Sequence, residues 1–210
     1  MTELDRRQLD AEIASCGRSH LALATWLHSL DGVDPTRPSE LRGWTVGHVL
    51  THIARNADSH LDLLDGRRQY PSAESRDADI DAGAGRSWGE LVDDVTATAV
   101  ALDERWASTS DWSGTAEMLS GQRPRHLLPL LRQREVEIHW IDLGLGRRFE
   151  DLPAEYLRKD LRLMEMLWRA RKPMGLTPLP DAALALAPPT RLAWMMGRID
   201  VPGLSPASLF

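Results

Sequence analysis

The sequence predicts a mainly α-helical protein: an antiparallel four-helix bundle followed by a small C-terminal domain that is α or α/β. Three observations support this prediction. Four long segments repeat apolar residues at the spacing of one helix face. Fairly short connections join the first segment to the second and the third to the fourth, as in an antiparallel bundle. The 210 residues suffice for one full core with a small addition. We therefore expect a bundle domain over residues 1–150 and a small domain over residues 151–210.

The first two helices are predicted by periodicity and by the residues at their ends. Residues 4–30 repeat apolar side chains without an interior proline, and two X-Pro pairs follow this segment. A second helix begins after a Gly-Trp turn, with Thr45 as its N-cap. It runs to about Asp65, where a glycine ends it. These two segments supply half of the expected bundle.

The middle of the chain contains a polar segment and then a third helix. Residues 66–86 are polar, glycine-rich and aperiodic, so we expect a mobile loop there. Ser87 and Glu90 have the spacing of a capping box, which places the start of the third helix. Its apolar periodicity lasts to about Trp106.

The remaining elements are placed by proline and glycine. The fourth helix should begin near Pro124 and end at Gly144. A charged amphipathic helix is expected over residues 153–170, after which the chain is rich in proline. Within that stretch, Ala182–Ala187 is either a short strand or an extended arm. A short helix in the segment TRLAWMMGR closes the chain.

Composition excludes several functional classes. The formal net charge of −6 argues against a nucleic-acid groove, which needs clustered basic residues. The sequence has no apolar run of membrane-spanning length and no apolar region typical of a secretory signal, so a cytoplasmic location without membrane partners is expected. Cys16 is the single cysteine and is interpreted as a core residue. Motifs of serine hydrolases, phosphate-binding loops and dinucleotide-binding folds do not occur.

One set of residues fits a metal site. Glu135 and His139 are four residues apart in the fourth helix, so they face the same way and can reach one ion. His52 lies on the flank of the second helix's apolar stripe and can turn towards a neighbouring helix. Two histidines and one carboxylate leave a tetrahedral ion with one open position, and zinc, iron or nickel would suit them. Asp142 is a candidate outer acceptor for a ligating histidine.

The same spacing has a simpler interpretation. A glutamate and a histidine one turn apart are also typical of an exposed polar pair. Helical periodicity alone therefore leaves both interpretations of the Glu135–His139 pair open. For His48 we prefer an exposed position, and for His60 packing at the boundary of the core.

Three segments together give the sequence a family resemblance. They are LRGWTVGHVLTHIARNADSH, RQREVEIHWIDLGLG and LAWMMGR. In combination they resemble the mycothiol-dependent maleylpyruvate isomerase family, a branch of the DinB-like metal-dependent thiol transferases. The resemblance implies a DinB-like four-helix bundle followed by a small C-terminal domain. It also implies that His52, Glu135 and His139 are the metal ligands and that Arg198 binds an anion. A cation closing a helix end is the alternative role for Arg198.

The resemblance further implies an enzyme that uses zinc or another divalent metal together with mycothiol. A thiolate would add to an electrophile, either to isomerise maleylpyruvate from cis to trans or to transfer mycothiol sulfur to another small molecule. Arg55 and Arg134 are weaker candidates for binding polar groups of mycothiol. The alternative is a metal-stabilised binding or regulatory module without turnover. The expected partners are mycothiol and a small electrophile, and the sequence leaves monomer and homodimer open.

Overall fold

The computed structural model describes residues 3–171 and 177–207. The chain divides into two compact units, Met1–Leu145 and Gly146–Phe210, which are described separately. Within the described residues, no helix combines the length and the apolar character needed to cross a membrane.

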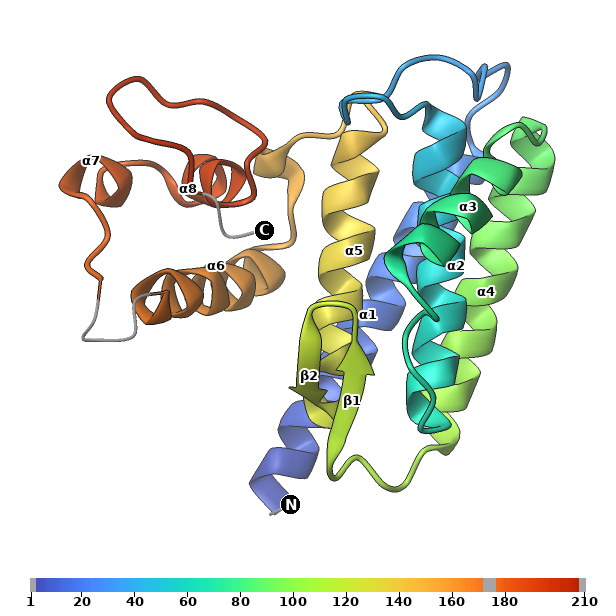
Figure 1. The fold of residues 1–210 in the computed structure, drawn as a ribbon, viewed down its shortest axis with the longest axis horizontal. Coiled ribbons are helices and arrows are strands. Elements are labelled where there is room, and N and C mark those ends of the chain that lie inside the picture. Colours follow the sequence, from blue (N-terminus) through green and yellow to red (C-terminus); the bar gives the residue numbers. More distant parts are fainter. Residues whose placement is uncertain (1–2, 172–176, 208–210) are drawn as a thin grey trace. The chain divides into compact units, whose positions relative to one another are not determined.

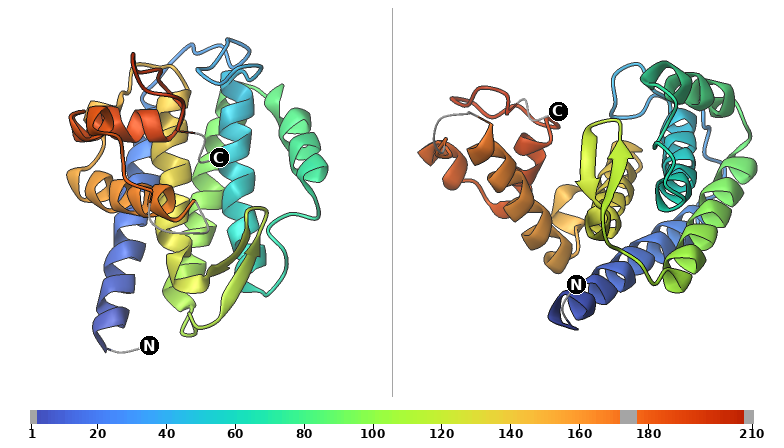
Figure 2. Two further views of the ribbon diagram at one scale, coloured as in Figure 1. Left: turned by 60° about the vertical axis from the view of Figure 1, so that its left-hand side comes forward. Right: turned by 60° about the horizontal axis from the view of Figure 1, so that its bottom comes forward.

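Four long helices form the bundle of the first unit, and Figures 1 and 2 show them side by side. The predicted helical bundle is confirmed. Each of the first two bundle helices packs against both of the last two bundle helices. The shared core is built from apolar side chains of all four helices and includes Leu27, Leu50, Val95 and Val136. The helices are α1 (Glu3–His28), α2 (Val46–Leu64), α4 (Trp88–Ser108) and α5 (Leu128–Asp142).

Side-chain pairs give the directions of the neighbouring helices. Arg55 pairs with Asp94, and Asp65 near the end of α2 pairs with Arg105 near the end of α4, so α2 and α4 run in parallel. By the same reasoning α1 is parallel to α5, because Ser15 pairs with Gln133 and Ser19 with Glu137. α1 is antiparallel to α4, because His20 pairs with Asp103 and Leu30 with Trp88. α2 is antiparallel to α5, because His52 pairs with Glu135 and Ile53 with Arg132. Parallel neighbours require a connection that returns the chain to its starting end.

That connection contains a helix where the sequence predicts a mobile loop over residues 66–86. This prediction is wrong, because α3 spans Ala73–Ala84. The Ser72 side chain caps it by accepting a hydrogen bond from the Ser75 backbone. Ile80 and Ala84 are its buried residues, so its sequence lacks a visible apolar stripe.

Two glycines allow α3 to pack closely on α2. A Cβ atom at Gly47 would overlap the Ala84 carbonyl oxygen. A Cβ atom at Gly83 would come within 2.5 Å of the Thr51 side chain. The backbones therefore approach to a distance that larger residues would prevent. This close contact fixes the position of α3 beside the start of α2.

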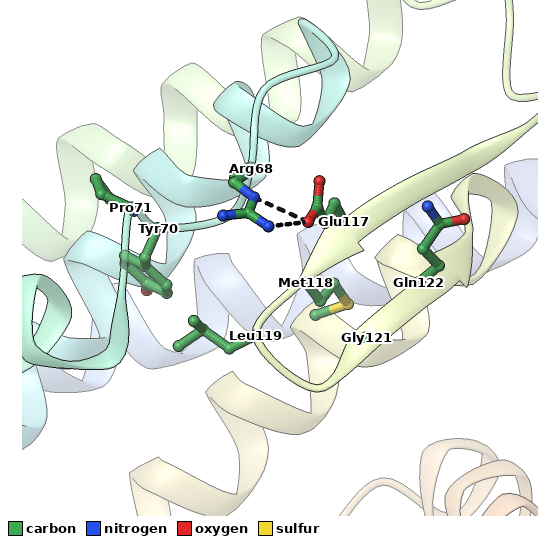
Figure 3. A pocket seen from close by; sticks show the side chains of 8 residues that line it. All are labelled: Arg68, Tyr70, Pro71, Glu117, Met118, Leu119, Gly121 and Gln122. Carbon is green, nitrogen blue, oxygen red and sulfur yellow. Dashed lines mark hydrogen bonds and ion pairs between the residues drawn. The ribbon is translucent and has the colours of Figure 1, made fainter.

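A β-hairpin that the sequence analysis does not anticipate precedes the last bundle helix. Strands β1 (Thr115–Met118) and β2 (Gly121–Pro124) pair antiparallel. A 3₁₀ turn, Arg125–Leu127, then leads into α5, which begins four residues after the predicted Pro124. Arg68 pairs with Glu117, and between them and the hairpin tip lies a cavity of about 280 Å³ (Figure 3). The hairpin is thereby attached to the segment that follows α2.

The described residues of the second unit form helices and no strand, so an α rather than an α/β domain is found there. The prediction of a strand or extended arm at Ala182–Ala187 is wrong, because α7 forms in this stretch. The first residues of the proline-rich stretch, 174–176, lie outside the described part of the chain. Trp168 and Trp194 pack α6 against α8, with ring centroids 5.1 Å apart. The elements are a 3₁₀ turn (Phe149–Asp151), α6 (Ala154–Ala170), α7 (Asp181–Leu184) and α8 (Pro188–Met195).

His60 lies fully inside the bundle, so its predicted position at the core boundary is wrong. Neither ring nitrogen forms a hydrogen bond within the described residues. Burial lowers the pKa of His60 to about 3, and the nearby Arg132 charge adds to this effect. The ring packs edge-on against Trp106, with centroids 6.1 Å apart. The fold therefore holds this imidazole in its neutral form.

We predict that His60 makes the bundle sensitive to acid. Its pKa is about 3 in the folded protein and 6.5 in a model peptide, so the unfolded chain binds the proton first as the pH falls. The free energy of unfolding should decrease as the pH drops below about 6.5, by roughly 2–3 kcal/mol from this residue at pH of about 4.5. His60→Leu should remove this residue's contribution to the decrease, as measured by urea unfolding above pH of about 6.5 and at pH of about 4.5. Exposed His126→Leu is the control; equal acid sensitivity of His60→Leu and wild type would contradict the assignment.

Candidate metal centre

Two histidines and one glutamate meet between α2 and α5. His52 comes from α2, and Glu135 and His139 lie one turn apart on α5. Nε2 of His52 is 2.9 Å from Oε2 of Glu135, and Nε2 of His139 is 3.4 Å from the same oxygen. One potential ligand atom from each residue lies within 4.8 Å of the other two. The fold thus brings together the three residues that the sequence analysis selects as metal ligands.

Burial and hydrogen bonding set the charges of these groups. Burial and, to a smaller extent, the neighbouring His139 together lower the pKa of His52 to about 4. For Glu135, burial opposes ionisation, but hydrogen bonds with His139 and His52 hold its pKa well below the ordinary value. A neutral imidazole and an ionised carboxylate are the forms that bind a metal cation. At neutral pH His52 is therefore neutral and Glu135 is ionised, which are the charge states that ligation requires.

Asp142 contacts the ring nitrogen of His139 that does not face Glu135. Its Oδ2 lies 2.9 Å from Nδ1 of His139, and its side chain is buried. Burial tends to lower the pKa of His139, but hydrogen bonds with Asp142 and Glu135 outweigh this effect and raise it. Because Asp142 accepts the proton of Nδ1, Nε2 is the nitrogen of His139 that faces Glu135 and could ligate a metal. This is the outer acceptor role expected for Asp142.

The donor set fits a divalent transition metal. Two imidazole nitrogens and a carboxylate oxygen are common ligands of zinc and also suit iron or nickel. The side chains of Glu135 and His139 are 31% and 14% exposed, so the site is accessible from one side. Three protein ligands leave a position for a further ligand, the arrangement typical of catalytic rather than structural zinc.

Two residues near the site were not selected from the sequence. The ring of Trp44 lies 5.6 Å from that of His52, measured between centroids. Arg76 on α3 places Nη2 3.4 Å from Nδ1 of His52. The available signal for α3 is the segment Pro-Ser-Ala-Glu, with Ser72 as N-cap and an acid in the first turn. Even with that helix predicted, the sequence does not show that Arg76 faces His52.

Two arginines that the sequence analysis proposes for mycothiol lie on the bundle helices. Arg55 donates a hydrogen bond of 2.7 Å to Asp94. Arg134 is half-buried, whereas the fully buried arginine of α5 is Arg132. Arg132 donates hydrogen bonds to the Ile53 carbonyl and to other buried groups. Roles of Arg55 and Arg134 in binding mycothiol remain predictions.

Arg198 belongs to the second unit and follows the last helix. Gly197 adopts a positive φ of 67°, and the Arg198 backbone N–H then donates to the carbonyl of Ala193. Nη1 of Arg198 donates a 2.8 Å hydrogen bond to the Met196 carbonyl. This contact is consistent with the alternative role of a cation at the end of α8. Its role in binding an anion remains a prediction.

Comparison with known proteins identifies the family. Residues 16–144 match the family model described as the mycothiol maleylpyruvate isomerase N-terminal domain. This match covers more than half of the 210 residues, so the chain belongs to that family, as the sequence motifs predict. No curated protein gives a significant match.

Two solved structures resemble most of the chain in fold. One is the crystal structure of the mycothiol-dependent maleylpyruvate isomerase, which is 27% identical and has a TM-score of 0.72. It covers 81% of this chain, and 75% of that chain is covered. The other is a mutant form under the same name, with 23% identity, a TM-score of 0.79 and coverage of 94% and 92%. The predicted DinB-like fold is confirmed by these likenesses.

We predict that metal affinity depends on both the ligand and its support. His139→Ala should abolish stoichiometric zinc binding, because it removes one of three donor atoms. Asp142→Asn should weaken it by about 10- to 100-fold, because the negative charge behind His139 is lost. Zinc content and competition with a chelator measure both effects, and circular dichroism checks that the helices remain. Exposed His126→Ala is the control. A full equivalent of zinc on His139→Ala would refute the assignment of this ligand.

Proposed function

We propose that the protein is a metal-dependent, mycothiol-using enzyme that directs a thiolate to a small electrophile. The observation that carries the proposal is the convergence of two histidines and one glutamate, with ligand atoms within 4.8 Å of one another. Its support is membership of a family described as mycothiol maleylpyruvate isomerase. Zinc is the proposed metal because the donor set and its three-residue count are typical of catalytic zinc.

The residues of the site have separate tasks in this proposal. His52, Glu135 and His139 hold the metal, and Glu135 offsets part of its charge. Asp142 keeps the proton of His139 on Nδ1, so that Nε2 can ligate. A divalent ion held there would lower the pKa of a thiol, so that thiolate would be available near neutral pH.

The thiol itself must come from a small molecule. Cys16 is the single cysteine of the chain and is fully buried. Burial raises the pKa of its thiol well above the ordinary value, so it remains protonated. The chain therefore supplies no thiolate of its own, and mycothiol is the proposed source.

Two reactions would use the same site. In an isomerase, the thiolate adds to the double bond of maleylpyruvate and a proton is taken up at the neighbouring carbon. The resulting single bond rotates, and loss of the proton and of the thiolate gives the trans isomer. In a transferase, the thiolate attacks an electrophile and the adduct leaves. Mycothiol is regenerated in the first reaction and consumed in the second.

The proposal is tested by incubating the zinc-loaded protein with mycothiol and either maleylpyruvate or an alkylating electrophile. We expect mass spectrometry and chromatography to detect the trans isomer or the mycothiol adduct. Formation should require both zinc and the thiol, and His139→Ala serves as the inactive control. If neither product forms on protein that holds zinc, a metal-stabilised module without turnover becomes the better interpretation.

A second prediction concerns Arg198, which matches the arginine of the family's closing motif. We propose that its guanidinium binds a substrate carboxylate through paired hydrogen bonds. Arg198→Ala should then reduce kcat/KM by about 10-fold or more while zinc content stays the same. If kcat/KM is unchanged, the alternative role holds: Arg198 stabilises the end of α8 through its hydrogen bond to the Met196 carbonyl.

A further inference from the structure

Arg76 is the cationic side chain of α3 that reaches the metal centre. Nη2 lies 3.4 Å from Nδ1 of His52, and the guanidinium carbon lies 5.8 Å from the centre of the Trp44 ring. Nη1 lies 2.8 Å from a carboxylate oxygen of Asp77. The side chain of Arg76 is 25% exposed and that of Asp77 is 59% exposed. The guanidinium is therefore held at the site while remaining accessible to small anions.

Packing of the backbone places Arg76 there. The contacts at Gly47 and Gly83 bring α3 against α2, the helix that carries His52. The face of the Trp44 ring attracts the Arg76 guanidinium through a cation–π interaction. Both features restrict where the side chain can go. The contact with His52 is thus built into the fold of this segment.

The hydrogen bond from Arg76 selects one form of His52. A guanidinium only donates, so Nδ1 of His52 must accept, and the proton of the neutral ring then sits on Nε2. In that form, Nε2–H points to Oε2 of Glu135 at 2.9 Å. A metal ion at Nε2 needs the opposite form, with the proton on Nδ1. Two donors would then face each other, so metal ligation and the Arg76–His52 hydrogen bond exclude one another.

We propose that Arg76 is an anion-binding residue of this site, which metal binding frees from His52 to take a carboxylate of the substrate. The inference rests on the proposed function. A guanidinium matches a carboxylate with two parallel hydrogen bonds, a geometry that a point charge lacks. The present partner, Asp77, is exposed to water, so its ion pair is weak and can be displaced. The ligand class is a small carboxylate or dicarboxylate.

The proposal requires metal and anion to strengthen each other's binding. Metal at His52 frees Arg76 for the anion, and an anion on Arg76 removes the hydrogen bond that favours the wrong form of His52. By linkage the two factors are equal. Without a bound anion, Arg76 should weaken metal binding, because it adds positive charge and stabilises the form of His52 that carries its proton on Nε2. Removing Arg76 should therefore preserve or increase the affinity for zinc.

Calorimetric titration with maleate, an unsaturated dicarboxylate, tests this coupling. In wild type, zinc-loaded protein should bind maleate more tightly than metal-free protein, and maleate should raise zinc affinity by the same factor. Arg76→Gln should lower maleate affinity of the zinc-loaded protein by about 10- to 100-fold and remove the coupling. Its zinc affinity, measured against a competing chelator, should equal or exceed that of wild type. The uncharged diamide of maleate should bind both proteins equally weakly.

Arg67→Gln is the matched control, because Arg67 is an exposed arginine paired with Asp62 and Asp65. It should leave zinc affinity, maleate affinity and their coupling unchanged. Equal maleate affinity of Arg76→Gln and wild type, with zinc bound to both, would overturn the role of Arg76 alone. Weaker zinc binding by Arg76→Gln would likewise overturn it. Absence of zinc binding by wild type would overturn the proposed function and this inference together.

Discussion

The site depends on one carboxylate, Glu135, placed between two imidazoles on different helices. Burial by itself would favour its neutral form, yet hydrogen bonds with His52 and His139 keep it ionised. A partly buried charge of this kind is costly unless it is paired. The helical repeat places Glu135 and His139 on one side of α5, but His52 requires α2 to lie alongside. Packing of the bundle and the charge of the site are therefore parts of one arrangement.

Much of that arrangement is readable from the sequence, because it rests on local rules. Thr45 and Ser87 cap α2 and α4 as predicted, and each side chain accepts a hydrogen bond from the third residue of its helix. Glu135 and His139 are neighbours because they are four residues apart in a helix. His52 could be selected because it flanks the apolar stripe of its helix. These signals need no knowledge of which helices pack together.

The remaining features depend on contacts between segments that are distant in the sequence. The helix α3 buries Ile80 and Ala84, and its position is set by glycines on two helices. No periodic pattern can reveal such packing, so the segment resembles a loop, and Arg76 was missed with it. Ala182–Ala187 illustrates the same limit in a short element, where four helical residues have too little periodicity to distinguish a helix from a strand.

A second set of side chains shows that the chain's own thiol is not placed for catalysis. Cys16, His20 and Asp103 are arranged like a nucleophile, a base and an orienting acid: Sγ lies 3.7 Å from Nε2 of His20, and Nδ1 lies 2.9 Å from Asp103. However, Nε2 of His20 already accepts a hydrogen bond from Arg132, so it cannot take the thiol proton. Cys16 is also fully buried. These residues therefore stabilise the bundle, and the thiol of the proposed reaction has to come from outside the chain. The partly exposed side chains of Glu135 and His139 would give it access to the proposed metal centre.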